Sequence, residues 1–192
     1  MPLIPYISAS GSAPHSFTNQ FYFPLSSDHL ITIIQFNVLR GILTNMTILN
    51  LLSTLPLECG GALNLPQHPY PDSSSVLLSL LPTPLQILTQ HAPWIDIFPS
   101  ATVRDNLIRN QGYYDDEELC HDMVGGLYEG FDEVQRYGMV VWNDPWAAEG
   151  WGVTEGFVQE WGFLLKGAGE IIAATNRWRG LRGENELVLE YT

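Results

Sequence analysis

Charged side chains are scarce in this sequence, at 15% of its 192 residues, where an average soluble domain has roughly 25%. Lysine is nearly missing, since Lys166 is the only one. A disordered tail needs many charges and few apolar residues, but here 45% of the residues are hydrophobic. The composition therefore excludes a disordered tail and indicates a globular chain that is long enough to bury one core.

Basic residues are much rarer than acidic ones. Eight Lys and Arg stand against 21 Asp and Glu, which gives a net charge of −13. Residues 101–192 carry 17 of the acidic and seven of the basic residues. Because a phosphate-binding surface needs clustered cations, we expect no direct DNA binding by this chain.

Cysteine and long apolar runs are also rare. Cys59 and Cys120 are too few for a disulfide scaffold or a zinc site of four cysteines. The basic segment that opens a secretory signal is missing after Met1. The longest uncharged hydrophobic stretch, residues 41–57, has 17 residues and several polar side chains, whereas a membrane span needs about 20 mostly apolar residues. We expect a nuclear or cytoplasmic protein that does not associate with membranes.

Helical periodicity is the main pattern in the sequence. After the cap signal at residues 26–28, apolar side chains recur every three or four residues, which predicts a long helix stopped by Pro56. Eight prolines in residues 56–99 predict long loops with a short helix over 76–81. Ser100 is predicted to cap another helix. The four acidic residues at 115–118 are predicted to form the first turn of the helix after it.

Thr154 is expected to begin the last helix, whose apolar stripe continues without a break to Ile172. Residues 138–142 form the one plausible strand, which would be solitary. The predicted fold is mainly α, a single-domain helical bundle with long Pro-rich loops and at most a short strand or hairpin. We expect a flexible arm over residues 1–25, the helical domain over 26–184 and a C-terminal tail over 185–192.

The sequence contains no arrangement typical of an enzyme or a metal site. Cys120, His121 and Asp122 are adjacent, and neighbours on a helix point about 100° apart, so they cannot form a nucleophilic triad. The five histidines show no spacing typical of metal ligands. Residues 167–169 lack the third glycine of a dinucleotide-binding motif and are expected inside a helix. We therefore expect no catalysis, no metal and no cofactor.

Tryptophan is abundant, with six residues of which three lie within positions 142–151. A turn at Pro145 would hold Trp142 and Trp146 close together. These rings either pack in the core or line a pocket for a flat ligand or a peptide. Arg177 and its basic neighbours either contact nucleic acid or close a helix. The candidate residues for binding a ligand or partner are Trp94, Asp96, Trp142, Asp144, Trp146, Trp151, Arg177 and Trp178.

Several segments together resemble one family, in the same order along residues 28–184. Among them are HAPWID at 91–96, VWNDPW at 141–146, GWGVTEGF at 150–157, WGFLLKG at 161–167 and TNRW at 175–178. Further matching segments are residues 28–31, 35–38, 44–46, 82–86, 104–108 and 116–120. The family is the conserved C-terminal domain, of unknown biochemical function, of fungal basic-leucine-zipper (bZIP) transcription factors.

The resemblance implies a transcription-regulatory role in the nucleus. Residues 1–39 contain no Lys or Arg, so the basic region that grips DNA is missing and the chain is similar to the regulatory domain alone. The implied partner is the transcription machinery, another bZIP protein or a small ligand. The alternative is a stand-alone small-molecule sensor with a Trp-rich pocket. Partner binding predicts an exposed apolar patch, whereas sensing predicts an enclosed cavity.

Overall fold

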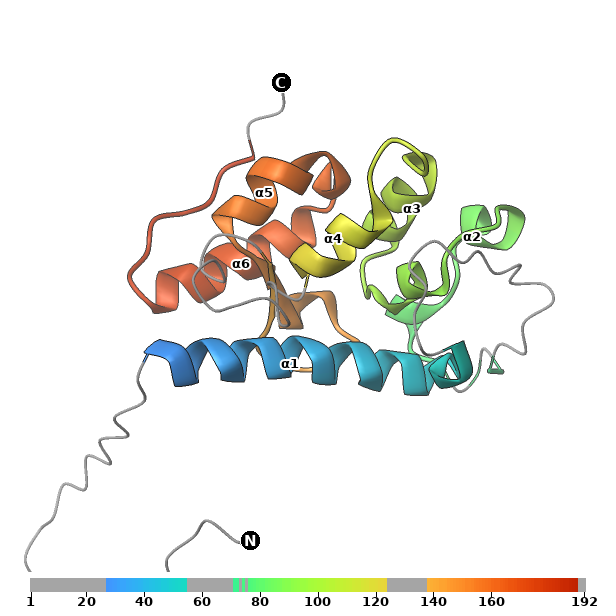
Figure 1. Cartoon of the computed structure of the whole chain (residues 1–192), viewed down its shortest axis with the longest axis horizontal. Helices are drawn as coiled ribbons and strands as arrows, with labels where there is room; N and C mark the ends of the chain where they lie inside the picture. The colour runs from blue at the N-terminus through green and yellow to red at the C-terminus, as the bar shows by residue number, and fades with distance from the viewer. Residues whose placement is uncertain (1–26, 55–70, 73, 75, 124–137, 190–192) are drawn as a thin grey trace, which may run out of the picture.

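The structure is a computed structural model, and it describes residues 27–54, 71–72, 74, 76–123 and 138–189. The expected N-terminal arm lies outside these residues. The described part is mainly helical with a two-stranded antiparallel hairpin, which confirms the predicted fold class. The long helix α1 runs along one side of the molecule, and the hairpin lies between α1 and α6 (Figure 1).

Helix α1, Ser27–Ile48, buries one face that includes Val38, Ile42 and Met46. It ends eight residues before Pro56, so the predicted stop is wrong. The backbone N–H groups of Asn50 and Leu51 donate to the carbonyls of Thr47 and Met46, and Asn50 has a φ of 58°. This is a Schellman motif, in which asparagine tolerates the left-handed conformation better than most residues do.

The hairpin pairs β1, Met139–Val141, with β2, Trp151–Val153. The prediction of a solitary strand was therefore wrong. Strand β2 was missed because it has only three residues, and its central Gly152 interrupts any alternation of apolar and polar side chains. Helix α1 packs on β1 at Gly41, where an added Cβ would lie 3.2 Å from Val141 Cγ2. Glycine at this position therefore permits the close approach of helix and strand.

The C-terminal region contains two helices where the sequence predicted one. Thr154 caps α5, Glu155–Trp161, by accepting a hydrogen bond from the Phe157 N–H. A 3₁₀ helix, Gly162–Leu165, and then Gly167 with a φ of 79° separate α5 from α6, Gly169–Leu181. Residues 167 and 168 therefore lie between helices, and Gly169 is the first residue of α6. The apolar stripe runs on because the two helices and the turn between them face the same core.

The middle of the chain is built from short helices. Thr83 and Gln86 form a capping box on α2, Pro84–Leu88, and Ser100 caps α3, Ala101–Arg109, as predicted. Asp115 accepts hydrogen bonds from two N–H groups in the first turn of α4, Asp116–Met123. The expected helix over 76–81 is only a 3₁₀ turn, Leu78–Leu80. Two further 3₁₀ turns are Pro93–Ile97 and Ala148–Gly150.

The last described residues lie against α6. Leu187 is buried, and its N–H donates to Asn176 Oδ1 while its carbonyl accepts from Asn176 Nδ2. The stretch expected as a tail thus packs on the domain as far as these contacts reach. Among the helices described, none combines the length and the hydropathy that crossing a bilayer requires.

Candidate functional site

Trp142 and Trp178 form a stacked pair at the surface. Trp142 follows β1 and Trp178 lies on α6, and their ring centroids are 5.5 Å apart with an angle of 27° between the planes. The guanidinium of Arg177 lies 5.0 Å from the Trp178 ring and that of Arg182 lies 4.8 Å from the Trp142 ring. We call these four side chains the indole–guanidinium stack. It joins three of the predicted site residues with Arg182, which the candidate set did not include.

The backbone around β2 determines where the stack forms. Gly152 lacks a side chain, and an added Cβ would lie 3.3 Å from both Trp142 Nε1 and Thr175 Oγ1. The missing side chain therefore leaves space for the Trp142 indole and lets α6 approach β2. Thr175 fixes this contact, because its hydroxyl oxygen accepts a hydrogen bond of 3.1 Å from the Val153 N–H and donates to the Ile171 carbonyl.

The basic residues of the stack differ in how they are neutralised. Arg182 binds the Glu184 carboxylate with two guanidinium nitrogens, and this hydrogen bond lowers the pKa of Glu184. Arg179, next to the stack, bonds Glu155 at 2.7 Å. Arg177 has no carboxylate partner among the residues that the structure describes. Its exposed guanidinium thus lies within cation–π distance of an indole, and its N–H groups are available to an anion.

The predicted tryptophan cluster divides between core and surface. Trp151 is fully buried, donates from Nε1 to the Pro145 carbonyl at 2.7 Å, and contacts Phe98, which in turn contacts Trp94. Trp146 is half-buried against the core. Trp142 stacks with Trp178 instead of meeting Trp146 across the turn. The side chain of Asp144 is exposed beside this loop.

A small cavity of about 10 Å³ lies elsewhere, among core residues. Its lining is apolar and includes Phe98, Leu107, Phe157 and Leu165, without any tryptophan. This volume is about the minimum that holds one water molecule. The cavity therefore offers no room for the planar ligand that the sequence analysis considered.

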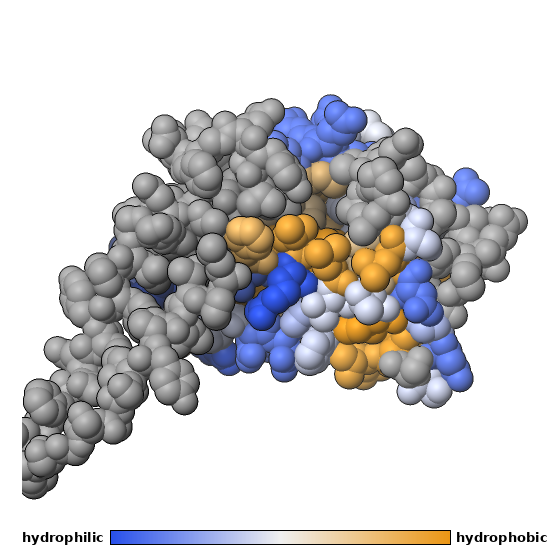
Figure 2. All heavy atoms as spheres, turned by 60° about the horizontal axis from the view of Figure 1, so that its bottom comes forward, coloured by the Kyte–Doolittle hydropathy of each residue, from blue (hydrophilic) through white to orange (hydrophobic). Residues whose placement is uncertain are grey.

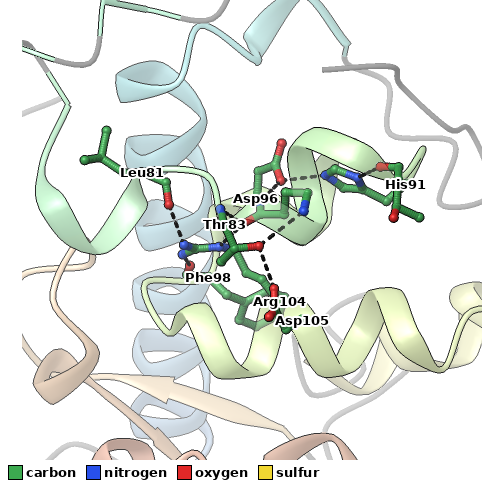
Figure 3. Close-up of polar contacts among 9 residues, drawn as sticks. Leu81, Thr83, His91, Asp96, Phe98, Arg104 and Asp105 are labelled. Carbon is green, nitrogen blue, oxygen red and sulfur yellow. Dashed lines mark hydrogen bonds and ion pairs between the residues drawn. The ribbon is translucent and has the colours of Figure 1, made fainter. Parts of the chain in front are cut away.

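Asp96, another predicted site residue, belongs to a buried polar cluster (Figure 3). Its Oδ1 accepts hydrogen bonds from Gln86 Nε2 and, at 2.9 Å, from His91 Nε2. Arg104 donates from Nε to Gln86 Oε1 and from its terminal nitrogens to the carbonyls of three loop residues. All four side chains are about 1% exposed. The cluster thus fastens the proline-rich loops to α3 and stabilises the fold, where solvent cannot reach it.

The surroundings of His91 in this cluster favour its doubly protonated form. Its Nδ1 lies 2.7 Å from the Thr89 carbonyl and its Nε2 faces the Asp96 carboxylate, so both nitrogens must donate. Burial lowers the pKa of His91, but the hydrogen bond and charge of Asp96 and the Thr89 carbonyl outweigh burial and raise the pKa above 6.5. The imidazolium is therefore part of the folded structure.

The described residues show no constellation that suits nucleophilic or metal chemistry. Cys120 is half-buried against the core, whereas His121 is exposed and lies 3.3 Å from Asp122. Asp122 also accepts a hydrogen bond from Trp161 Nε1. Among the described residues, no group of three His, Cys, Asp or Glu side chains could hold a metal ion.

Sequence reasoning missed most of the buried cluster. Gln86 had a detectable signal, because Thr83 and Gln86 have the spacing of a capping box. His91 and Arg104 had no such signal, since nothing in the sequence around them distinguishes a buried polar side chain from an exposed one.

These features define a mainly α-helical domain with a buried polar cluster and an indole–guanidinium stack at its surface. A family model described as Domain of unknown function (DUF3425) matches residues 69–172, more than half of the chain, and the chain belongs to this family. No curated protein and no solved structure matches the chain.

Proposed function

We propose that this chain is a transcription-regulatory module of a fungal bZIP-type factor, that it acts in the nucleus by binding a protein partner, and that it neither contacts DNA nor catalyses a reaction. The indole–guanidinium stack carries the proposal. Tryptophan and arginine are the residues that most often anchor protein interfaces. In this stack they are already ordered in the free chain, which lowers the entropy lost on binding.

The resemblance to the fungal bZIP domain supplies the regulatory context, and the geometry favours a protein over a small molecule. A planar ligand stacked on the indoles would compete with a guanidinium, because Arg177 lies 5.0 Å from the Trp178 ring and Arg182 lies 4.8 Å from the Trp142 ring. A protein partner can instead bind the exposed edges of the stack and place a carboxylate on Arg177.

A reporter assay tests this function. The chain is fused to an unrelated DNA-binding domain in a fungal cell, and transcription from the matching promoter is compared with that from the DNA-binding domain alone. We expect the fusion to change transcription. Trp178→Leu and Arg177→Ala should abolish most of the change, because each removes an anchor of the interface, while the midpoints of thermal unfolding of the purified variants stay close to that of the wild type.

Tyr113→Leu is the matched control, since Tyr113 is an aromatic residue that is 86% exposed and lies outside the stack. It should leave the reporter signal unchanged. A wild-type fusion that acts like the DNA-binding domain alone would refute the regulatory role. Full activity of both stack variants would show that the partner binds elsewhere.

A further inference from the structure

A second surface, independent of the stack, lies on the exposed side of α1. A shallow groove of about 360 Å³ follows the helix there, and we call its lining the α1 stripe. The stripe consists of Phe36, Leu39, Arg40, Leu43, Thr44 and Thr47. Figure 2 looks onto this side of the molecule and shows hydrophobic side chains gathered on it.

The stripe is apolar except at one point. Phe36 is 61% exposed and lines the same face of the helix as two leucines, Leu39 and Leu43. Both threonine hydroxyls are already used, because Thr44 Oγ1 donates to the Arg40 carbonyl and Thr47 Oγ1 to the Leu43 carbonyl. The threonines therefore present their methyl groups, and the only charge in the lining is Arg40.

Arg40 has no carboxylate partner among the described residues. It is also the only Lys or Arg in the first 100 residues. A cation in the middle of an apolar stripe favours an occupant that brings a carboxylate, because covering Arg40 with apolar atoms would leave a desolvated, unpaired charge.

The same charge disfavours a second copy of this chain. Two α1 helices packed antiparallel at the centre of the groove would place the two Arg40 residues within about 5 Å of each other along the helix axis, given the 1.5 Å rise per residue. Like charges at this distance repel, and the net charge of −13 on each copy adds to the repulsion.

We propose that the α1 stripe docks an amphipathic helix of a partner protein, with apolar side chains three or four residues apart and one carboxylate that meets Arg40. The stripe spans residues 36–47, about 16 Å along the helix axis or three turns, which matches such a ligand in length. A helix seated in a groove is read through anchors at this spacing. Because this chain is strongly acidic, the remaining surface of the partner helix is neutral or basic.

Selection from a displayed library of three-turn helical peptides tests the proposal on the full chain. Apolar, acidic, basic and neutral residues are allowed at every position that faces the target. We expect the enriched peptides to share three spaced apolar residues and one Asp or Glu. Phe36→Ser should weaken their binding about tenfold or more, as expected for loss of a central anchor, while Leu88→Ser, an exposed leucine on α2, should not.

A charge exchange tests the role of Arg40. Arg40→Glu should weaken binding of the enriched peptide, and replacing its carboxylate by lysine should restore binding to the variant. Enriched peptides that lack an acid, or that tolerate both Phe36→Ser and Arg40→Glu, would overturn the proposal. So would a library from which no peptide sensitive to Phe36→Ser emerges.

A photo-crosslinker placed at Thr47 identifies the occupant directly. A crosslink to the added peptide that Phe36→Ser abolishes supports the proposal. A crosslink to a second copy of the chain, with dimers that Phe36→Ser dissociates in sedimentation, would assign the stripe to self-association. An intramolecular crosslink to residues 1–25 that the peptide does not displace would assign it to the chain itself. Either result overturns the proposal.

Discussion

Single buried polar side chains hold the loop-rich half of this domain together. Arg104 is the clearest case, because one guanidinium bonds the Gln86 side chain and the carbonyls of Ser79, Leu81 and Phe98. The 3₁₀ turns and proline-rich loops leave many backbone carbonyls that need hydrogen-bond donors. An apolar side chain at this position could not supply these hydrogen bonds. A buried cation is expensive to desolvate, and here it satisfies four acceptors at once.

Arg104→Met should therefore lower the free energy of unfolding by about 3–5 kcal/mol, the usual loss when one member of a buried ionic network is removed. Urea unfolding followed by tryptophan fluorescence measures this change. The control is Arg109→Met on the same helix, where the side chain is 59% exposed and pairs with Asp105; it should cost less than about 1 kcal/mol. Equal losses in the two variants would contradict the assigned role of the cluster.

His91 makes the stability depend on pH. Because folding raises the pKa of His91 above 6.5, the stabilisation by the imidazolium is complete below this value and is lost as the pH rises through the raised pKa. We expect the free energy of unfolding to fall as the pH rises above 6.5, and this fall to be smaller in His91→Gln. An identical pH dependence in the two proteins would show that His91 is neutral in the fold.

At the scale of the elements, the hairpin loop depends on tight backbone packing. An added Cβ on Gly150 would lie 2.4 Å from the Asp144 carbonyl oxygen, which is backbone and cannot rotate away. The Gly150 carbonyl also accepts the Trp142 N–H. A side chain at this position would therefore push apart the two ends of the loop that carries Trp142 to the stack.

Gly150→Ala should consequently destabilise the domain by about 1–3 kcal/mol, as overpacking of a tight site does. Gly169→Ala is the control, because no atom lies within 4 Å of its added Cβ and alanine favours helices; it should be neutral or slightly stabilising. Thermal unfolding followed by circular dichroism compares the two. A neutral Gly150→Ala would mean that the loop adjusts more freely than this contact allows.

The elements also show how far the sequence could predict the fold. The caps at Ser100, Asp115 and Thr154 were predictable because each lies a few residues from the N–H groups that it satisfies. The end of α1 at Ile48 and the break near Gly167 were missed, because the apolar periodicity continued through both. Strand β2 was missed because its pairing with β1 depends on contacts across the loop and not on its own three residues.

The candidate site was predictable only residue by residue. Trp142, Arg177 and Trp178 were predicted separately, but their stacking requires α6 to pack on β2 through Thr175 and the absence of a side chain at Gly152. Trp94, Asp96 and Trp151 were predicted for the same kind of site and instead lie in the core, because burial is a property of the tertiary structure. The pattern of residue types therefore predicted candidate residues but not which of them lie together at the surface.

At the scale of the whole molecule, the charges are distributed unevenly over an acidic chain. Three of the eight basic residues, Arg177, Arg179 and Arg182, fall within six positions at the end of α6. A fourth, Arg40, is alone on α1. The two proposed binding surfaces, the indole–guanidinium stack and the α1 stripe, thus each present a cation that the described residues leave without a carboxylate. The net charge of −13 supports the proposal that the chain does not bind polyanions such as DNA.

One side-chain contact also bears on how the chain is made. Asn45, buried on α1, donates from Nδ2 to the carbonyls of Ile97 and Pro145, and Pro145 lies 100 positions later in the chain. During synthesis, α1 leaves the ribosome long before the strand and the loop that cover it. The apolar face of α1 stays exposed until the hairpin has been translated. Contacts between segments so far apart in the sequence slow folding, and the exposed apolar face promotes aggregation of the nascent chain. We therefore expect the nascent chain to depend on chaperones while its second half is translated.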